Sequence, residues 1–189
     1  MLNIIAGSLS AGVAPVTGSY ESIATVTVGS GGSSSISFTS IPSTFTHLQI
    51  RYIARGTSSS AGQDSLVRFN GDTGSNYSWH LLYGDGATVV ANSSANATSM
   101  YIDALRAGGT AANIFTVGVV DILDYANTSK YKTIRTLSGD DINSSSFHMI
   151  GLWSGNWRST SAISSITIFP DFQNYAEYTQ FALYGIKGV

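Results

Sequence analysis

The sequence predicts an all-β protein: an antiparallel β-sandwich, jelly-roll-like, that follows an extended N-terminal arm. Short runs of β-branched and aromatic residues recur along the 189-residue chain, separated by clusters of Gly, Ser, Asn and Asp. No long window follows the helical period. A chain of this length can bury a core without disulfide bonds, and this one has no cysteine. We therefore expect a single sandwich domain over residues 20–189, with an arm over residues 1–19.

The N-terminal segment differs from a secretory signal. It has no basic start, and its apolar run is interrupted after Ala6 by Gly7 and Ser8. Glycines and Pro15 also disfavour a helix there. The segment still carries spaced apolar residues, which are too apolar for a free tail; we expect them to contact the capsid or a neighbouring subunit, and the alternative is a loose terminus. These contact residues are Leu2, Ile4, Ile5 and Leu9.

Apolar and polar residues alternate clearly along the strands in the first half of the predicted sandwich. Residues 23–28 place Ala24, Val26 and Val28 on one face, and a glycine-rich turn follows. Residues 47–55 have apolar side chains at even positions and Gln49, Arg51 and Arg55 at odd ones, which is typical of a half-buried strand with one wet face. A short strand over 36–38 lies between them.

The remaining strands are shorter or more uniformly apolar. Residues 113–123 form the most hydrophobic of them. Asp, Asn, Ser and Gly clusters mark the turns between strands. In total we expect about ten or eleven strands, jelly-roll-like in number. The further predicted strands cover residues 66–70, 77–83, 100–105, 131–137, 146–153, 162–169 and 177–186.

Composition argues against most enzymes and against nucleic-acid or membrane binding. Charged residues make up 11% of the chain and the net charge is −2, so there is no basic patch for phosphates or anionic lipids. No run is long enough to span a membrane. Acid, base or metal chemistry would depend on 11 carboxylates and 3 histidines. We expect no catalytic residue, no cofactor and no metal.

Two acidic features have both a functional and a structural interpretation. Asp121 interrupts a strongly apolar strand, and we expect it to pair with Lys132 or Arg135. Residues 70–76 space oxygen-bearing side chains in a glycine-containing loop, as calcium sites do, but Asp72 is the single carboxylate among them. A hairpin connection explains the same residues.

Tryptophans close together offer a candidate binding surface. Residues 153–158 read Trp-Ser-Gly-Asn-Trp-Arg, and we place them on a loop between two strands. Tryptophans on a loop are typical of glycan stacking or of a protein contact. The candidates are therefore Trp153, Trp157 and Arg158; the alternative is that the indoles cap the open end of the sandwich.

Six ordered stretches together resemble short β-rich virion surface proteins of tailed bacteriophages, a family common in cyanophages and other marine phages. The resemblance covers nearly everything after the arm. Relatives are described as structural, decoration or tail-fibre proteins, and the family supplies no catalytic residues. The six stretches are residues 20–25, 41–51, 69–78, 121–128, 130–135 and 181–188.

The resemblance implies a non-enzymatic virion structural protein on the outer surface of the particle. One hypothesis is a capsid decoration or cement protein that stabilises the head shell as a homotrimer bound to the major capsid protein. The alternative is a tail-fibre or receptor-binding module, bound to tail proteins, that recognises a host surface glycan. An enzyme such as a depolymerase is disfavoured by the few carboxylates. A single short sandwich without a shaft favours decoration.

Overall fold

The computed structural model describes residues 19–143 and 149–188 and confirms the all-β class. Within these ranges the chain forms twelve strands and no helix, and so no helix that could cross a membrane. The strands are β1 (Tyr20–Thr27), β2 (Ile36–Phe38), β3 (His47–Ala54), β4 (Gly62–Phe69), β5 (Tyr77–Gly84), β6 (Val89–Ala97), β7 (Met100–Arg106), β8 (Thr116–Ile122), β9 (Lys132–Asp140), β10 (Met149–Trp157), β11 (Ile166–Pro170) and β12 (Gln180–Ile186).

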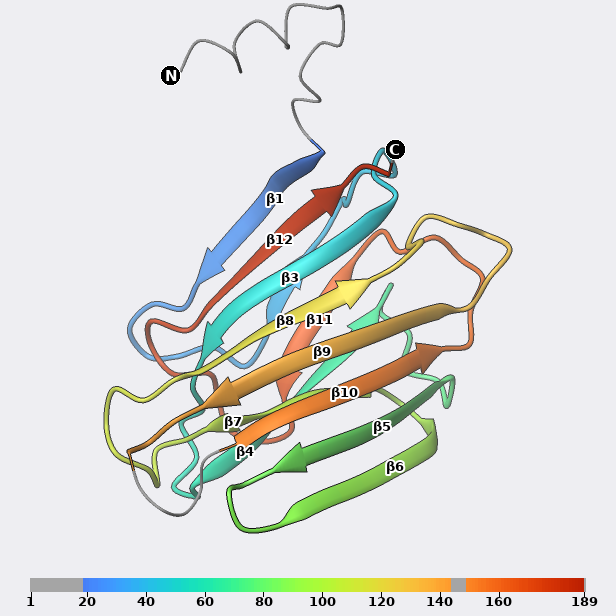
Figure 1. Ribbon diagram of the computed structural model, residues 1–189. Helices are drawn as coiled ribbons and strands as arrows, with labels where there is room; N and C mark the ends of the chain where they lie inside the picture. Colours follow the sequence, from blue (N-terminus) through green and yellow to red (C-terminus); the bar gives the residue numbers. More distant parts are fainter. Residues whose placement is uncertain (1–18, 144–148, 189) are drawn as a thin grey trace, which may run out of the picture.

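The strands form two antiparallel sheets of unequal size. The large sheet has the order β1-β12-β3-β8-β9-β10-β5-β6, and the small sheet has the order β2-β11-β4-β7. Figure 1 shows the small sheet lying behind the large one. This is the predicted antiparallel sandwich. The jelly-roll likeness stays a prediction, and the predicted arm lies outside the described residues except for Ser19.

Strict alternation along the central strands builds the core between the sheets. In β3 every second residue, from Leu48 to Ala54, is buried, and β9 buries every second residue from Lys132 to Ser138. The small sheet supplies apolar side chains such as Phe38, Phe69 and Ile168 from the opposite layer. Because alternate side chains point to opposite faces of a strand, the other half of each central strand lies on the outside of the sandwich.

The sequence did not predict β6. This strand reads Val-Val-Ala-Asn-Ser-Ser-Ala-Asn-Ala and has no buried residue. It lies at the edge of the large sheet and pairs only with β5 among the described strands (Figure 1). An edge strand whose inward side chains are only partly covered needs little apolar alternation, so the sequence carries only a weak signal for it.

Several predicted boundaries also shift. The strand expected over 146–153 extends to Trp157, while residues 146–148 lie outside the described residues, and the strand expected from residue 162 begins at Ile166. Residues 162–165 instead make contacts with a neighbouring loop: the Asn70 side chain accepts hydrogen bonds from the backbone NH groups of Ser164 and Ser165. The point at which β11 begins therefore depends on the side chain of Asn70, which lies almost one hundred residues earlier in the chain.

Candidate functional site

The predicted binding loop around the tryptophans is wrong. Residues 153–157 belong to β10, in the middle of the large sheet. Trp153 is 1% exposed and Trp157 is 2% exposed, so neither indole can stack on a glycan at the surface. Gly155 of this strand faces the core, where a Cβ atom would overlap the Met100 side chain.

Trp157 and Arg158 instead hold the loop that precedes β5. The Trp157 indole NH donates a hydrogen bond to Asp72 Oδ2 at 2.7 Å. Arg158 donates to the Ser75 carbonyl at 2.5 Å and to Asn96 Oδ1 at 2.8 Å. Both side chains therefore make structural contacts within the chain, which tie the end of β10 to the loop before β5 and to β6.

Loop 70–76 is not the hairpin that the sequence suggested, because it connects β4 of the small sheet to β5 of the large one. Asp72 accepts hydrogen bonds from the Gly74 NH on Oδ1 and from Asn76 Nδ2 and Trp157 on Oδ2. The bonds from Trp157 and Asn76 lower the pKa of Asp72. Over the described ranges no three side chains of the usual metal-binding types are grouped together.

Asp121 pairs with one of its two predicted partners. Its carboxylate lies 2.8 Å from Arg135 Nη2 and also accepts a bond from Gln49 Nε2. Partial burial would raise the pKa of Asp121, but the bonds from Arg135 and Gln49 outweigh it and lower the pKa. Lys132 points the other way and donates to three backbone carbonyls in the interior. Asp121 therefore has a structural partner on the outer surface.

The remaining predicted residues fall into two groups. Leu2, Ile4, Ile5 and Leu9, together with His148, lie outside the described residues. His47 accepts a hydrogen bond from the Asp124 backbone NH through Nδ1, and His80 is exposed on the outside of β5. The two described histidines thus lie on strands, as expected, and on different parts of the sheet.

Apolar side chains gather on the outside of the large sheet, where the sequence analysis placed no site. The register aligns them in two adjacent rows: one crosses β3, β8, β9, β10, β5 and β6, and the other has its apolar members on β8, β9, β10 and β5, with Arg51 at its β3 end. Ile150 is 69% exposed and Val89 is 76% exposed. We call this surface the outer apolar face; its members are Ile53, Val117, Ile150 and Val89 in one row and Val119, Leu137, Leu152 and Leu82 in the next.

A third row, next to the apolar ones, is polar. It contains the Asp121–Arg135 ion pair, with Gln49 on one side and Ser154 and His80 on the other. An apolar centre bordered by satisfied polar groups is the arrangement found in protein–protein interfaces. Monomeric proteins seldom expose apolar side chains over so many adjacent strands.

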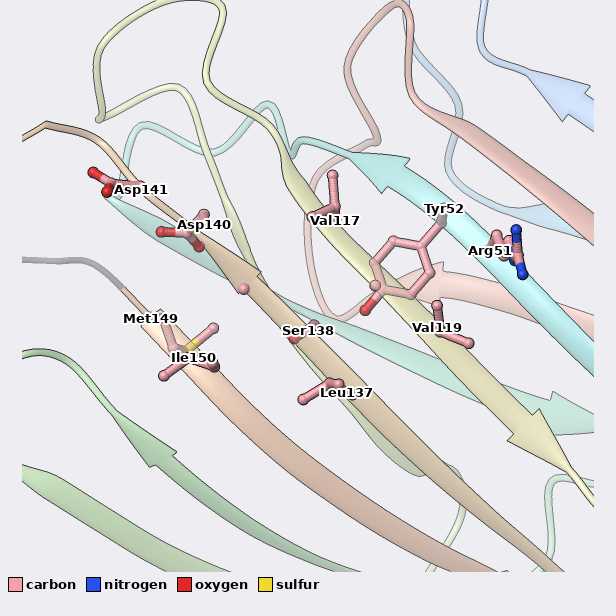
Figure 2. Close-up of a pocket in the computed structure, with 12 residues that line it drawn as sticks. Arg51, Tyr52, Val117, Val119, Leu137, Ser138, Asp140, Asp141, Met149 and Ile150 are labelled. Atoms are coloured by element: carbon pink, nitrogen blue, oxygen red, sulfur yellow. The ribbon is translucent and has the colours of Figure 1, made fainter.

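Two outward-facing glycines leave depressions in the outer apolar face. Gly139 lies between Val117 and Ile150 in the first row, and Gly84 lies between Ile150 and Val89. The hollow at Gly139 has a volume of about 750 Å³ and the one at Gly84 about 320 Å³. Figure 2 shows the larger hollow, with Leu137, Ile150 and Val117 on strands around it. Ile150 therefore projects between two depressions.

Polar groups lie directly beneath the larger hollow. Tyr52 OH and Ser138 Oγ each donate to Asp103 at 2.6 Å, and Asp103 is fully buried. Burial raises the pKa of this carboxyl to about 7, although the bonds from Ser138 and Tyr52 lower it. Arg106 Nε and Asp140 Oδ1 form a second buried pair at 2.8 Å. The groups around Asp103 are linked by hydrogen bonds, whereas Arg106 Nε and Asp140 Oδ1 are held together by charge without a well-aligned hydrogen bond.

A sequence signal for the outer apolar face did exist. Residues 117–123 are apolar at both odd and even positions, except for Asp121. Such runs are typical of strands that are covered on both faces, whereas a strand with one wet face alternates. Ile150 and Leu152 break the alternation of β10 in the same manner.

Comparisons of this chain with models of known protein families, with curated proteins and with solved structures found no match. The molecule is a sandwich with one unusually apolar outer surface and buried polar groups beneath it. Such an arrangement can support association with another surface.

Proposed function

We propose that this chain is a non-enzymatic structural protein of a tailed-bacteriophage virion, a capsid decoration or cement protein that assembles as a homotrimer on the outer surface of the head shell. One observation carries the proposal: the outer apolar face spans six strands and is left exposed in the single chain. The resemblance described from the sequence supplies the virion context.

A second copy of the same chain is the partner that fits the outer apolar face. Ile150 projects from it, and hollows lie on both sides of Ile150 at Gly139 and Gly84. The Ile150 side chain of one copy can enter a hollow of another, so the surface carries both halves of a contact. The net charge of −2 gives little repulsion between copies.

In a trimer with threefold symmetry, the outer apolar face of every copy would contact both neighbouring copies. The half of the face on β3 and β8 would meet one neighbour, and the half on β10, β5 and β6 would meet the other. Closed symmetry of this kind is the common state of soluble homo-oligomers. The sandwich rim and the small sheet then remain available for the major capsid protein or for other virion proteins.

Attachment to the shell is assigned, as the sequence suggested, to Leu2, Ile4, Ile5 and Leu9. Deleting residues 2–18 tests this assignment. We expect the truncated protein to keep its sandwich and to fail to join particles, because burying several apolar side chains supplies the anchoring free energy. Full occupancy of the truncated protein on particles would contradict the anchoring role.

The decisive experiment for the proposed function counts copies on the particle. Imaging of intact virions by electron cryomicroscopy, with the protein located by a specific antibody fragment, should give hundreds of copies distributed over the head. A few dozen copies or fewer, confined to the tail, would contradict the decoration role and favour the tail-fibre alternative.

A further inference from the structure

A cleft opens at the β5–β6 edge of the sandwich, on the opposite side of the sheet from the outer apolar face. It has a volume of about 260 Å³. Residues from both sheets line it, and the register shows that β5 and β6 contribute their inward faces. Its lining consists of Asp64, Trp79, Leu81, Tyr83, Val90, Asn92 and Tyr101.

The unequal size of the two sheets creates this cleft. β7 is the last strand of the small sheet and packs against β9, β10 and β5. β6 extends the large sheet by one further strand (Figure 1). Because β6 projects past the small sheet, the inward side chains Val90 and Asn92 keep a solvent-accessible side instead of joining the core.

The walls of the cleft are aromatic. Trp79 and Tyr101 come from opposite sheets, and their ring centroids lie 5.4 Å apart with an interplanar angle of 43°. Behind them Tyr101 stacks on the buried Trp153 at 6.4 Å and 7°. Trp79 and Tyr83 are half-buried, as is Tyr101, so each ring is held by packing yet still has accessible surface. Rings of this kind are rigid platforms for a ligand.

A carboxylate is fixed at the end of the aromatic walls. Asp64 Oδ1 accepts a hydrogen bond from Tyr101 OH, while its backbone NH donates to Asp171 Oδ1 at 3.1 Å. Burial raises the pKa of Asp64, against the effect of the Tyr101 bond, and Asp171 raises it further. Among residues 19–143 and 149–188, no group donates to Asp64 Oδ2. That oxygen can accept a bond from a ligand.

Asn92 adds a donor on the other side of the cleft. Its Oδ1 atom accepts a hydrogen bond from the Ser93 NH at 2.7 Å, which orients the amide. The Nδ2 group has no acceptor within the described part of the chain. The cleft thus combines flat aromatic surfaces with one acceptor and one donor that face a ligand rather than each other.

We propose that this cleft binds one neutral sugar residue of a glycan. The C–H face of a pyranose carries partial positive charge and packs on the electron-rich face of an aromatic ring. Vicinal hydroxyl groups can donate to Asp64 Oδ2 and accept from Asn92 Nδ2. Asp64 and Asp171 disfavour anionic sugars by charge repulsion. At about 260 Å³ the cleft is slightly smaller than the ~300–1,000 Å³ that ligand pockets span, which suits a single ring.

Fluorine NMR of protein labelled with 5-fluorotryptophan provides a sensitive readout. The chain has 3 tryptophans, and Trp153 and Trp157 are buried, so Trp79 is the only indole with a surface that a ligand can reach. Titration with glucose, galactose, mannose, N-acetylglucosamine and their oligosaccharides should shift the Trp79 resonance at millimolar concentrations with at least one of them. The resonances of Trp153 and Trp157 should stay in place.

Two variants and one control identify the cleft as the origin of the shift. Asp64→Asn removes the charged acceptor and keeps the shape, and should weaken binding about tenfold or more. Tyr83→Ala removes a wall and should weaken it similarly. His80→Ala, on the opposite side of the same strand, should bind as the unaltered protein does. Fluorine spectra without sugar verify that each variant is folded.

Three results would overturn the proposal. One is the absence of any Trp79 shift with the whole panel up to the solubility of the sugars. Another is a sugar-induced shift that Asp64→Asn and Tyr83→Ala both leave unchanged. The third is preferential binding of sialic acid or a uronic acid, which would contradict the neutral class. None of these results depends on oligomeric state or on virion attachment.

Discussion

Asp103 is a carboxyl group whose pKa is strongly raised in the interior. It is fully buried, and Tyr52, Ser138 and the Ala104 backbone NH all donate to its two oxygens. Even so, desolvation raises its pKa from 3.8 to about 7. The folded protein therefore keeps a proton that the unfolded chain releases near pH 4.

The first prediction is that Asp103 makes stability fall as the pH rises. The protonated carboxyl contributes fully below the unfolded-chain pKa, and this contribution is lost as the pH rises from about 4 to about 7. Relative to Asp103→Asn, the unaltered protein should lose about 4 kcal/mol of unfolding free energy over that range. Urea denaturation at several pH values measures the difference. Parallel pH profiles for the two proteins would contradict this role of Asp103.

Lys132 is a buried cation without a buried carboxylate partner among the described residues. Its Nζ donates to the carbonyls of Asn127, Lys130 and Thr160, at 2.6, 2.9 and 3.2 Å. Burial lowers the pKa of this amine, although Asp124 raises it. The lysine ties the turn before β9 to the segment that follows β10.

We predict that Lys132→Met destabilises the protein by about 3 kcal/mol, because three inward-facing carbonyls lose their donor. Lys130→Met is the matched control: the Lys130 side chain is 59% exposed and pairs with Asp124 at the surface, so its loss should cost under about 1 kcal/mol. Chemical denaturation followed by fluorescence compares them. Equal losses for the two variants would show that the carbonyl contacts are unimportant.

At the scale of elements, the loop between β4 and β5 is organised by a strand from elsewhere in the sandwich. Asn70 and Gly71 adopt positive φ angles of 52° and 67°, which these two residue types tolerate well. The chain then passes Asp72, whose oxygens are both hydrogen-bonded. The loop that connects the two sheets is thus stabilised by the Asp72 carboxylate, which accepts a hydrogen bond from Trp157 of β10.

The third prediction concerns this loop. Trp157→Phe should destabilise the protein by about 1–2 kcal/mol through loss of the bond to Asp72, beyond the effect of ring size. In a double-mutant cycle the same change in an Asp72→Asn background should cost clearly less. Added millimolar calcium should leave the thermal midpoint of the unaltered protein unchanged, since both Asp72 oxygens are engaged. Additive losses, or a calcium-dependent rise of the midpoint, would contradict this assignment.

At the scale of the whole molecule, the two sheets divide the surface into distinct regions. The outer apolar face lies on one side of the large sheet, and the aromatic cleft lies on the other side at its β6 edge. Assembly through the face would leave the cleft accessible. A trimer could then present three copies of the cleft to a single glycan-coated surface, which raises the effective affinity of a weak site.

The fourth prediction is that single charges on the outer apolar face abolish assembly. Ile150→Lys should shift the protein from trimer to monomer in sedimentation equilibrium at micromolar concentration, because a buried unpaired ammonium is strongly unfavourable. Asn156→Lys lies on the same face of the same strand, beyond the apolar rows, and should leave the trimer intact. Trimers of Ile150→Lys, or monomers of the unaltered protein and the control alike, would contradict the proposed interface.

Local alternation was enough to predict most strands and the sandwich class. In β3 and β9 the burial of every second side chain follows directly from the period of the strand. A partner for Asp121 on the following strand, Lys132 or Arg135, was also predictable, since β8 and β9 are neighbours in sequence and adjacent strands usually pair; the structure selects Arg135. These features depend on short segments of the chain.

The sequence by itself therefore determined the class of the fold and most of its strands, and it narrowed the charge partner of Asp121 to Lys132 or Arg135. Only the tertiary structure decided which strands share a sheet, that Trp153 and Trp157 face inward, and that β6 projects beyond the small sheet. The physical reason is that alternation specifies two faces of a strand without specifying what covers each of them. Which strand faces are covered depends on strands far apart in the chain. The outer apolar face and the aromatic cleft both result from faces that are left uncovered.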